Sequence, residues 1–121
     1  MWLAAALIDA GNASEALVEA KRAYELMPVA PQAAGQYAAL LVKAGRTAPV
    51  LNELGNLAPL GRATYHSILE QTDLAAAAYE QAVKDRDPLA WFFVRAPRYR
   101  AIRESSRWPV LAKMMGLPET V

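Results

Sequence analysis

The chain has 121 residues and a formal net charge of +1, with 55% hydrophobic and 21% charged residues. This composition is that of a globular rather than a disordered chain and indicates one domain, residues 1–121. The absence of cysteine excludes a disulfide framework and a thiolate metal site, and it is compatible with a reducing cytoplasm, where we expect the protein to reside.

The chain opens on an apolar run, residues 1–8, which has no basic flank and is followed by Asp9. Such a run is too short to span a membrane or to serve as an export signal, so no membrane partner is expected. Because arrays of helical repeats normally begin with a polar cap, we expect these residues to continue a helix that starts earlier in a longer parent protein.

Two glycines, Gly11 and Gly45, lie 34 residues apart, and each follows an alanine-rich segment. A glycine at the end of such a segment is typical of a helix terminus, and a second helical segment follows each of the two. The sequence therefore predicts helical hairpins over about residues 1–28 and 31–57.

The second helix of the first hairpin is predicted to begin near Asn12 or Ser14, either of which can cap it. Small and apolar residues at helical spacing share one face of this helix. They are Ala16, Ala20, Ala23 and Met27. This face predicts close packing against a neighbouring helix.

A third hairpin is predicted over about residues 62–87, with its turn at Thr72-Asp73 and its end at Asp87-Pro88. Short helices bounded by prolines should follow over about residues 88–118. Five of the aromatic rings lie in this segment: Trp91, Phe92, Phe93, Tyr99 and Trp108. We expect these rings to cover the open flank of the third hairpin, and an aromatic ligand pocket is the alternative.

The residues at the packing positions of the first and third hairpins resemble those of tetratricopeptide repeats. In the first hairpin they are Leu3, Ala4, Leu7, Gly11, Ala16, Ala23 and Pro28. In the third they are Ala63, Ala75, Tyr79-Glu80-Gln81-Ala82 and Asp87-Pro88. The resemblance covers residues 1–88, and the last third resembles the closing segment of such arrays in bacterial multidomain proteins. The second hairpin departs from the pattern at Pro49, Val50, Leu54 and Leu57.

This resemblance implies an all-α fold, a right-handed solenoid of about three tetratricopeptide-like helical hairpins with a C-terminal cap of short helices. It also implies that the first helices of successive hairpins line a concave binding groove. The groove residues would be Ala5, Ile8, Tyr37, Leu40, Leu41, Thr64 and Ser67. The lysine, arginine and asparagine side chains with which the family clamps a terminal carboxylate are absent from these positions, so an apolar peptide, an adjacent domain or a second copy fits better.

Catalytic constellations are lacking, because His66 is the only histidine and no glycine-rich loop precedes a Lys-Ser or Lys-Thr pair. The sequence therefore predicts no enzyme, cofactor or metal. Basic residues concentrate in the last third, and Arg100, Arg103 and Arg107 would share one face of a helix starting at Pro97. A nucleic-acid surface built on them is the third possibility and ranks below the two protein-binding alternatives.

The sequence thus favours a non-enzymatic protein–protein interaction scaffold that belongs to a larger signalling or regulatory protein. The main alternative is a homo-oligomeric structural module in which the N-terminal helix pairs with a second copy.

Overall fold

The computed structural model describes residues 7, 11–27, 30–45 and 57–118. All the regular structure in these ranges is helical and no strand occurs in them, which confirms the all-α prediction for the described residues. The helices are α2 (Ala13–Leu26), α3 (Pro31–Lys43), α5 (Pro59–Ile68), α6 (Thr72–Lys84), α7 (Pro88–Phe92), the 3-10 helix η2 (Pro97–Tyr99), α8 (Arg100–Arg103) and α9 (Trp108–Met115).

Two predicted helices fall almost entirely outside the described residues. These are the helix expected to end near Ala10, of which only Leu7 is described, and the helix expected over about 47–57, of which only Leu57 is described. The number of hairpins and the handedness of their arrangement therefore stay predictions.

Both glycines expected at helix ends have a left-handed backbone. The φ angle is +81° at Gly11 and +69° at Gly45, a region that residues with a Cβ atom rarely adopt. After Gly11, the Asn12 amide donates back to the Leu7 carbonyl oxygen at 2.8 Å, which closes the preceding turn. The prediction of a side-chain cap at Asn12 or Ser14 is wrong, because α2 begins at Ala13 and the Asn12 side chain makes no capping bond.

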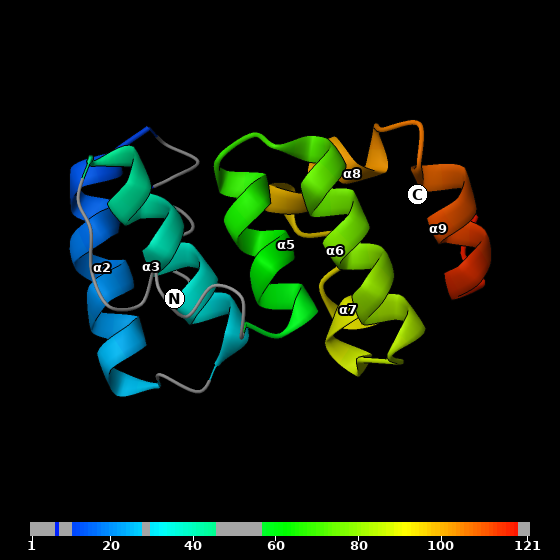
Figure 1. The fold of residues 1–121 in the computed structure, drawn as a ribbon, viewed down its shortest axis with the longest axis horizontal. Coiled ribbons are helices and arrows are strands. Elements are labelled where there is room, and N and C mark those ends of the chain that lie inside the picture. Colours follow the sequence, from blue (N-terminus) through cyan, green and yellow to red (C-terminus); the bar gives the residue numbers. More distant parts are fainter. Residues whose placement is uncertain (1–6, 8–10, 28–29, 46–56, 119–121) are drawn as a thin grey trace.

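The four long helices lie side by side in chain order (Figure 1). α2 packs on α3, α3 on α5, and α5 on α6. α3 and α5 run in the same direction, whereas α2 and α6 run in the opposite direction (Figure 1). The short helices that follow α6 pack against α5 and α6.

The α5–α6 pair differs at its boundaries from the predicted hairpin of residues 62–87. α5 begins at Pro59 because proline has no amide hydrogen to lose and its fixed φ angle suits the first helical position. The turn predicted at Thr72-Asp73 is instead the first turn of α6. The chain reverses just before it, where Glu70 adopts a left-handed φ of 61°.

Two buried glycines, Gly35 in α3 and Gly61 in α5, bring these helices into direct backbone contact. A Cβ atom on Gly35 would overlap the Gly61 carbonyl oxygen and lie 3.0 Å from the carbonyl carbon. Since real Cβ atoms essentially never come that close to a backbone oxygen, α3 and α5 can approach this far only with glycine at position 35.

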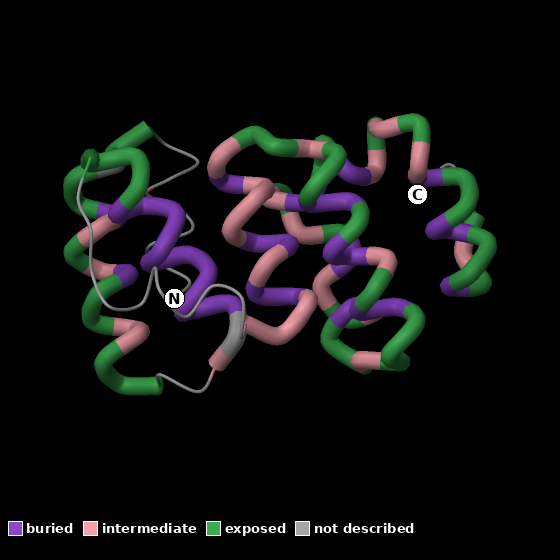
Figure 2. Tube along the Cα trace, viewed as in Figure 1, coloured by how far each residue is buried: buried purple, intermediate pink, exposed green. Residues whose placement is uncertain are grey.

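The first hydrophobic core joins α2, α3 and the end of α5, and Figure 2 shows α3 buried along most of its length. Its buried members are Ala16, Ala20, Ala34, Tyr37, Ala38, Ala39, Leu40, Leu41 and Ile68. The packing face predicted for α2 is thus correct for Ala16 and Ala20. Ala23 is half-buried and lies outside this core, and the prediction fails at Met27, which follows the end of α2 and is 60% exposed.

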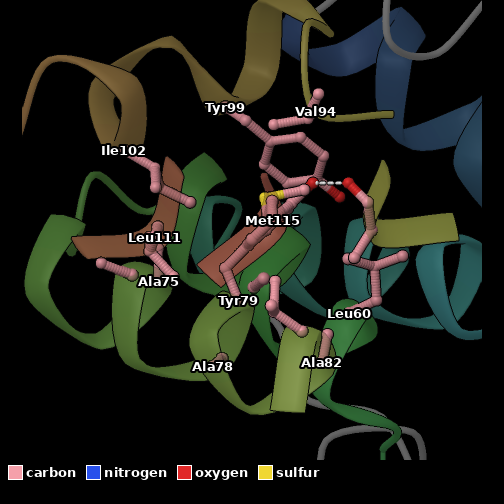
Figure 3. Close-up of a cluster of buried hydrophobic side chains, with 14 of the residues drawn as sticks. Leu60, Ala75, Ala78, Tyr79, Ala82, Val94, Tyr99, Ile102, Leu111 and Met115 are labelled. Carbon is pink, nitrogen blue, oxygen red and sulfur yellow. Dashed lines mark hydrogen bonds between the residues drawn. The ribbon is translucent and has the colours of Figure 1, made fainter. Parts of the chain in front are cut away.

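The second hydrophobic core joins α5 and α6 to the last third of the chain (Figure 3). The Tyr79 and Tyr99 rings meet edge to face with centroids 5.1 Å apart, and the Tyr79 hydroxyl donates to the Ala90 carbonyl oxygen. Trp108 is buried in the same cluster. The rings of the last third therefore cover α6 as predicted, except Phe92, which is 77% exposed.

Tyr99 also ties the last third of the chain to the helices of both cores. Its hydroxyl oxygen accepts from Gln32 Nε2 of α3 at 3.1 Å and lies 2.9 Å from Thr64 Oγ1 of α5. The single Thr64 hydroxyl hydrogen is donated to the Leu60 carbonyl oxygen, so Tyr99 must donate to Thr64. One buried hydroxyl thus links α3 to α5, and we call this chain of hydrogen bonds the Tyr99 clasp.

The contact between Gly35 and Gly61 predicts whether a substitution at position 35 stabilises or destabilises the protein. A Gly→Ala change inside a helix ordinarily stabilises a protein by about 0.5 to 1 kcal/mol. We expect Gly35→Ala to destabilise this protein by about 1 to 3 kcal/mol instead, because the added methyl group forces α3 away from α5. Chemical denaturation measures the change, and a more stable variant would contradict the contact.

The Tyr99 clasp predicts a loss of stability in Tyr99→Phe, because Gln32 Nε2 keeps no acceptor at this point and Thr64 loses its donor. The expected loss is about 1 to 3 kcal/mol in the free energy of unfolding. Tyr65→Phe is the matched control, since the half-buried Tyr65 makes no side-chain hydrogen bond with any described residue. Equal effects of the two variants in thermal and chemical denaturation would show that the hydroxyl of Tyr99 is not a link.

Candidate functional site

The groove residues predicted from the sequence are mostly buried inside the protein. Tyr37, Leu40 and Leu41 belong to the first core, and Thr64 is held in the Tyr99 clasp. Ser67 is half-buried, with a buried hydroxyl oxygen. The remaining two, Ala5 and Ile8, lie outside the described residues.

Leu40, Leu41 and Thr64 therefore line no open surface, and Tyr37 is only 9% exposed, which differs from the accessible lining expected of a groove. The reason is that α3 contacts α2 on one side and α5 on the other, so its apolar side chains are buried against these two helices. Whether a partner binds along this face stays a prediction.

One surface hollow formed by the described residues lies between α2 and α3. It encloses about 390 Å³ and is lined by Leu17, Val18, Lys21, Arg22, Glu25 and Tyr37. Its apolar part comes from Leu17, Val18 and the buried Tyr37, whose ring is held by Tyr24 at a centroid distance of 5.4 Å. We call this feature the α2 hollow.

The chemistry of the α2 hollow suits a side chain that is partly apolar. Val18 is 59% exposed, and Figure 2 shows α2 exposed along much of its length. Lys21, Arg22 and Glu25 give charges of both signs around the apolar part. The arrangement can bury a few apolar groups and pair charged neighbours.

Sequence reasoning missed the α2 hollow. The alternation of small and charged residues in α2 identifies the face that packs on α3, and Val18 falls on the opposite face. A valine among exposed charged residues is a weak signal, because single apolar residues are common on protein surfaces. The contribution of Tyr37 depends on how α3 lies against α2, and the sequence of α2 does not encode it.

His66 is half-buried, and its contacts with two neighbouring side chains are those of a structural histidine. Its Nδ1 atom lies 2.7 Å from Gln71 Oε1, and its ring meets the Tyr65 ring edge to face at 5.1 Å. Within residues 7, 11–27, 30–45 and 57–118, no group of three or more histidine, cysteine, aspartate or glutamate side chains is arranged to hold a metal ion.

The basic residues of the last third do not share one helix. Pro97 starts the 3-10 helix η2, α8 ends at Arg103, and Arg107 precedes α9. Arg103 Nη1 donates to the carbonyl oxygens of Val94 and Ala96 at 2.7 and 2.9 Å. The helical face expected from Arg100, Arg103 and Arg107 is therefore not formed.

Arg107 and Lys84 both lie beside one carboxylate. Arg107 Nη2 is 3.1 Å from Glu80 Oε2, and Lys84 Nζ is 3.6 Å from the same oxygen. The Arg107 contact joins the start of α9 to α6. It also pairs the Arg107 guanidinium with a carboxylate of the protein, so this cation is less available to a phosphate.

Burial perturbs two ionisable groups in this region. It raises the pKa of Tyr79 above the ordinary value of 10.0, and the charge of the Tyr99 phenolate would raise it further. Burial also lowers the pKa of Arg103, with the like charge of Arg100 adding to the effect. Neither group has a catalytic partner within the described residues, so both shifts reflect packing.

No protein-family model, no curated protein and no solved structure matches this chain. In the part of the chain that the structure describes, no helix is long and apolar enough to cross a membrane.

The two hydrogen bonds of Arg103 predict that this residue supports the fold. We expect Arg103→Ala to lower the free energy of unfolding by about 1 to 3 kcal/mol, since two carbonyl oxygens lose a charged donor. The exposed Arg100 of the same short helix is the control, and Arg100→Ala should change stability by no more than about 0.5 kcal/mol. Chemical denaturation of both variants decides, and an Arg103→Ala protein as stable as the control would contradict this role.

Proposed function

We propose that this chain is a non-enzymatic protein–protein interaction scaffold that binds a partly apolar peptide segment of a partner protein. The observation that carries the proposal is the α2 hollow, where Val18 stays exposed beside Leu17 and Tyr37 and charges of both signs surround them. A peptide that inserts one apolar side chain there would bury Val18, and polar groups beside it would meet Lys21, Arg22 or Glu25.

The arrangement of the helices supports a repeat-like scaffold. α3 and α5, which begin the second and third predicted hairpins, run in parallel and pack on each other, as the first helices of successive hairpins in a tetratricopeptide-like solenoid would. A right-handed array of about three such hairpins with its C-terminal cap is the architecture that we propose. The setting we propose is a larger bacterial signalling or regulatory protein in the cytoplasm, so the partner segment can also come from an adjacent domain.

A homo-oligomeric structural module is the second candidate, because Val18 and Leu26 of α2 are exposed apolar residues that a second copy can cover. Nucleic-acid binding ranks below both. Its support weakens because Arg103 donates to backbone carbonyl oxygens and Arg107 pairs with Glu80.

The proposal is tested by selecting peptides from a random display library against the full chain and measuring the dissociation constants of those recovered. We expect Val18→Glu to weaken binding at least tenfold, because it places a charge in the apolar part of the hollow. Leu74→Glu is the matched control, since Leu74 is an exposed apolar residue of α6, outside the hollow. It should leave affinity unchanged.

Two outcomes would contradict the proposal. Peptides whose affinity is the same for the Val18→Glu protein as for the unchanged chain would place binding elsewhere. Light scattering that shows a dimer dispersed by Val18→Glu, with no peptide recovered, would favour the homo-oligomeric candidate.

A further inference from the structure

The amide of Gln36 is the most unusual polar group in the interior. Gln36 lies in the middle of α3 and is 0% exposed, yet neither Nε2 nor Oε1 has a hydrogen-bond partner. A glutamine amide has two donor hydrogens and an acceptor oxygen, and leaving all of them unmet in a protein interior costs stability. Buried polar groups are nearly always paired with protein atoms or with ordered water.

A second unpartnered group lies on the neighbouring helix. Ser67 Oγ in α5 is buried and also lacks a hydrogen-bond partner. Gln36 follows Gln32 by four residues, and Ser67 follows Thr64 by three, so each stands one turn further along its helix. Because α3 and α5 run in the same direction, these two steps lead the same way from the Tyr99 clasp.

One turn earlier, where α3 and α5 pack on each other, the Tyr99 clasp shows how such a pair of polar side chains obtains hydrogen-bond partners. There the side chains of Gln32 and Thr64 do not bond each other, and a single oxygen atom serves both, at 3.1 and 2.9 Å. That oxygen belongs to Tyr99. One turn further, a glutamine and a hydroxyl recur on the same two helices without such an oxygen from the described residues.

We propose that Gln36 and Ser67 bind ordered water inside the seam between α3 and α5. Water fits the chemistry, because it donates to Gln36 Oε1, accepts from Gln36 Nε2 and exchanges hydrogen bonds with a hydroxyl. It also fits the burial, since a fully enclosed amide is reached by water more readily than by a larger ligand. The bound water extends the role of the Tyr99 oxygen by one helical turn.

Water-selective nuclear Overhauser spectroscopy on the full isotope-labelled chain tests the site. The side-chain amide protons of Gln36 are assigned by their disappearance in Gln36→Met, which keeps the length of the side chain without its polar atoms. We expect these protons to show cross-peaks from water that stays bound while the protein tumbles. The exposed Gln81 of α6 is the control and should show only rapidly exchanging water.

Stability measurements give an independent readout. If water joins the two side chains, Gln36→Met and Ser67→Ala remove overlapping parts of one network. Their effects should then be non-additive by about threefold or more in the unfolding equilibrium constant. Ser67→Ala alone should weaken the water cross-peak of Gln36. This variant tests the water site even if Gln36→Met does not fold.

Two results would overturn the inference. The first is an amide of Gln36 without a water cross-peak, together with additive variants, which means that the amide is dry. The second is a direct hydrogen bond between this amide and another part of the chain, seen as an Overhauser contact to a protein group in place of water.

Discussion

The backbone contact between Gly35 and Gly61 is the constraint on which the rest of the fold depends. It fixes how closely α3 and α5 approach, because any side chain at position 35 would collide with the Gly61 carbonyl group. With the two helices this close and parallel, Gln32 and Thr64 come within reach of one hydroxyl oxygen. A wider separation would leave the two side chains too far apart for Tyr99 to serve both. The contact thus determines where the last third of the chain attaches.

The fold of the last third depends in turn on aromatic and basic side chains, which in the sequence could equally indicate a ligand-binding or nucleic-acid surface. Its aromatic rings, except Phe92, are used for packing, with Tyr99 and Trp108 buried in the core built on α5 and α6. Its arginines are used in part for the backbone, since Arg103 donates to the carbonyl oxygens of Val94 and Ala96 between α7 and η2. An irregular segment of short helices leaves many carbonyl groups without helical partners, and a long cationic side chain satisfies two of them at once. The basic character of this region therefore has a structural explanation.

Sequence reasoning succeeded where the signal is local. Helical periodicity, the glycines at 11 and 45 and the prolines that begin α3 and α7 all act within a few residues, so the helical class and several helix ends could be predicted. It failed where the partner is distant. Gly35 looks like an isolated glycine until Gly61 is placed against it, and Tyr37 and Thr64 look like groove residues until α2 and Tyr99 bury them. The α2 hollow was missed for the same reason, since two helices build it jointly.

The Tyr99 clasp has a consequence for the order of folding during synthesis. Gln32 and Tyr99 are 67 residues apart in the chain, and the link between them cannot form until Tyr99 has left the ribosome. Until then α3 and α5 have their glycine contact but not the hydroxyl that joins them, and the α6 face beneath Tyr99 and Trp108 is uncovered. Chains fold from the N-terminus as they emerge, and exposed apolar surface during that interval favours aggregation. The nascent chain therefore passes through a vulnerable stage that ends only when η2 and α9 have emerged.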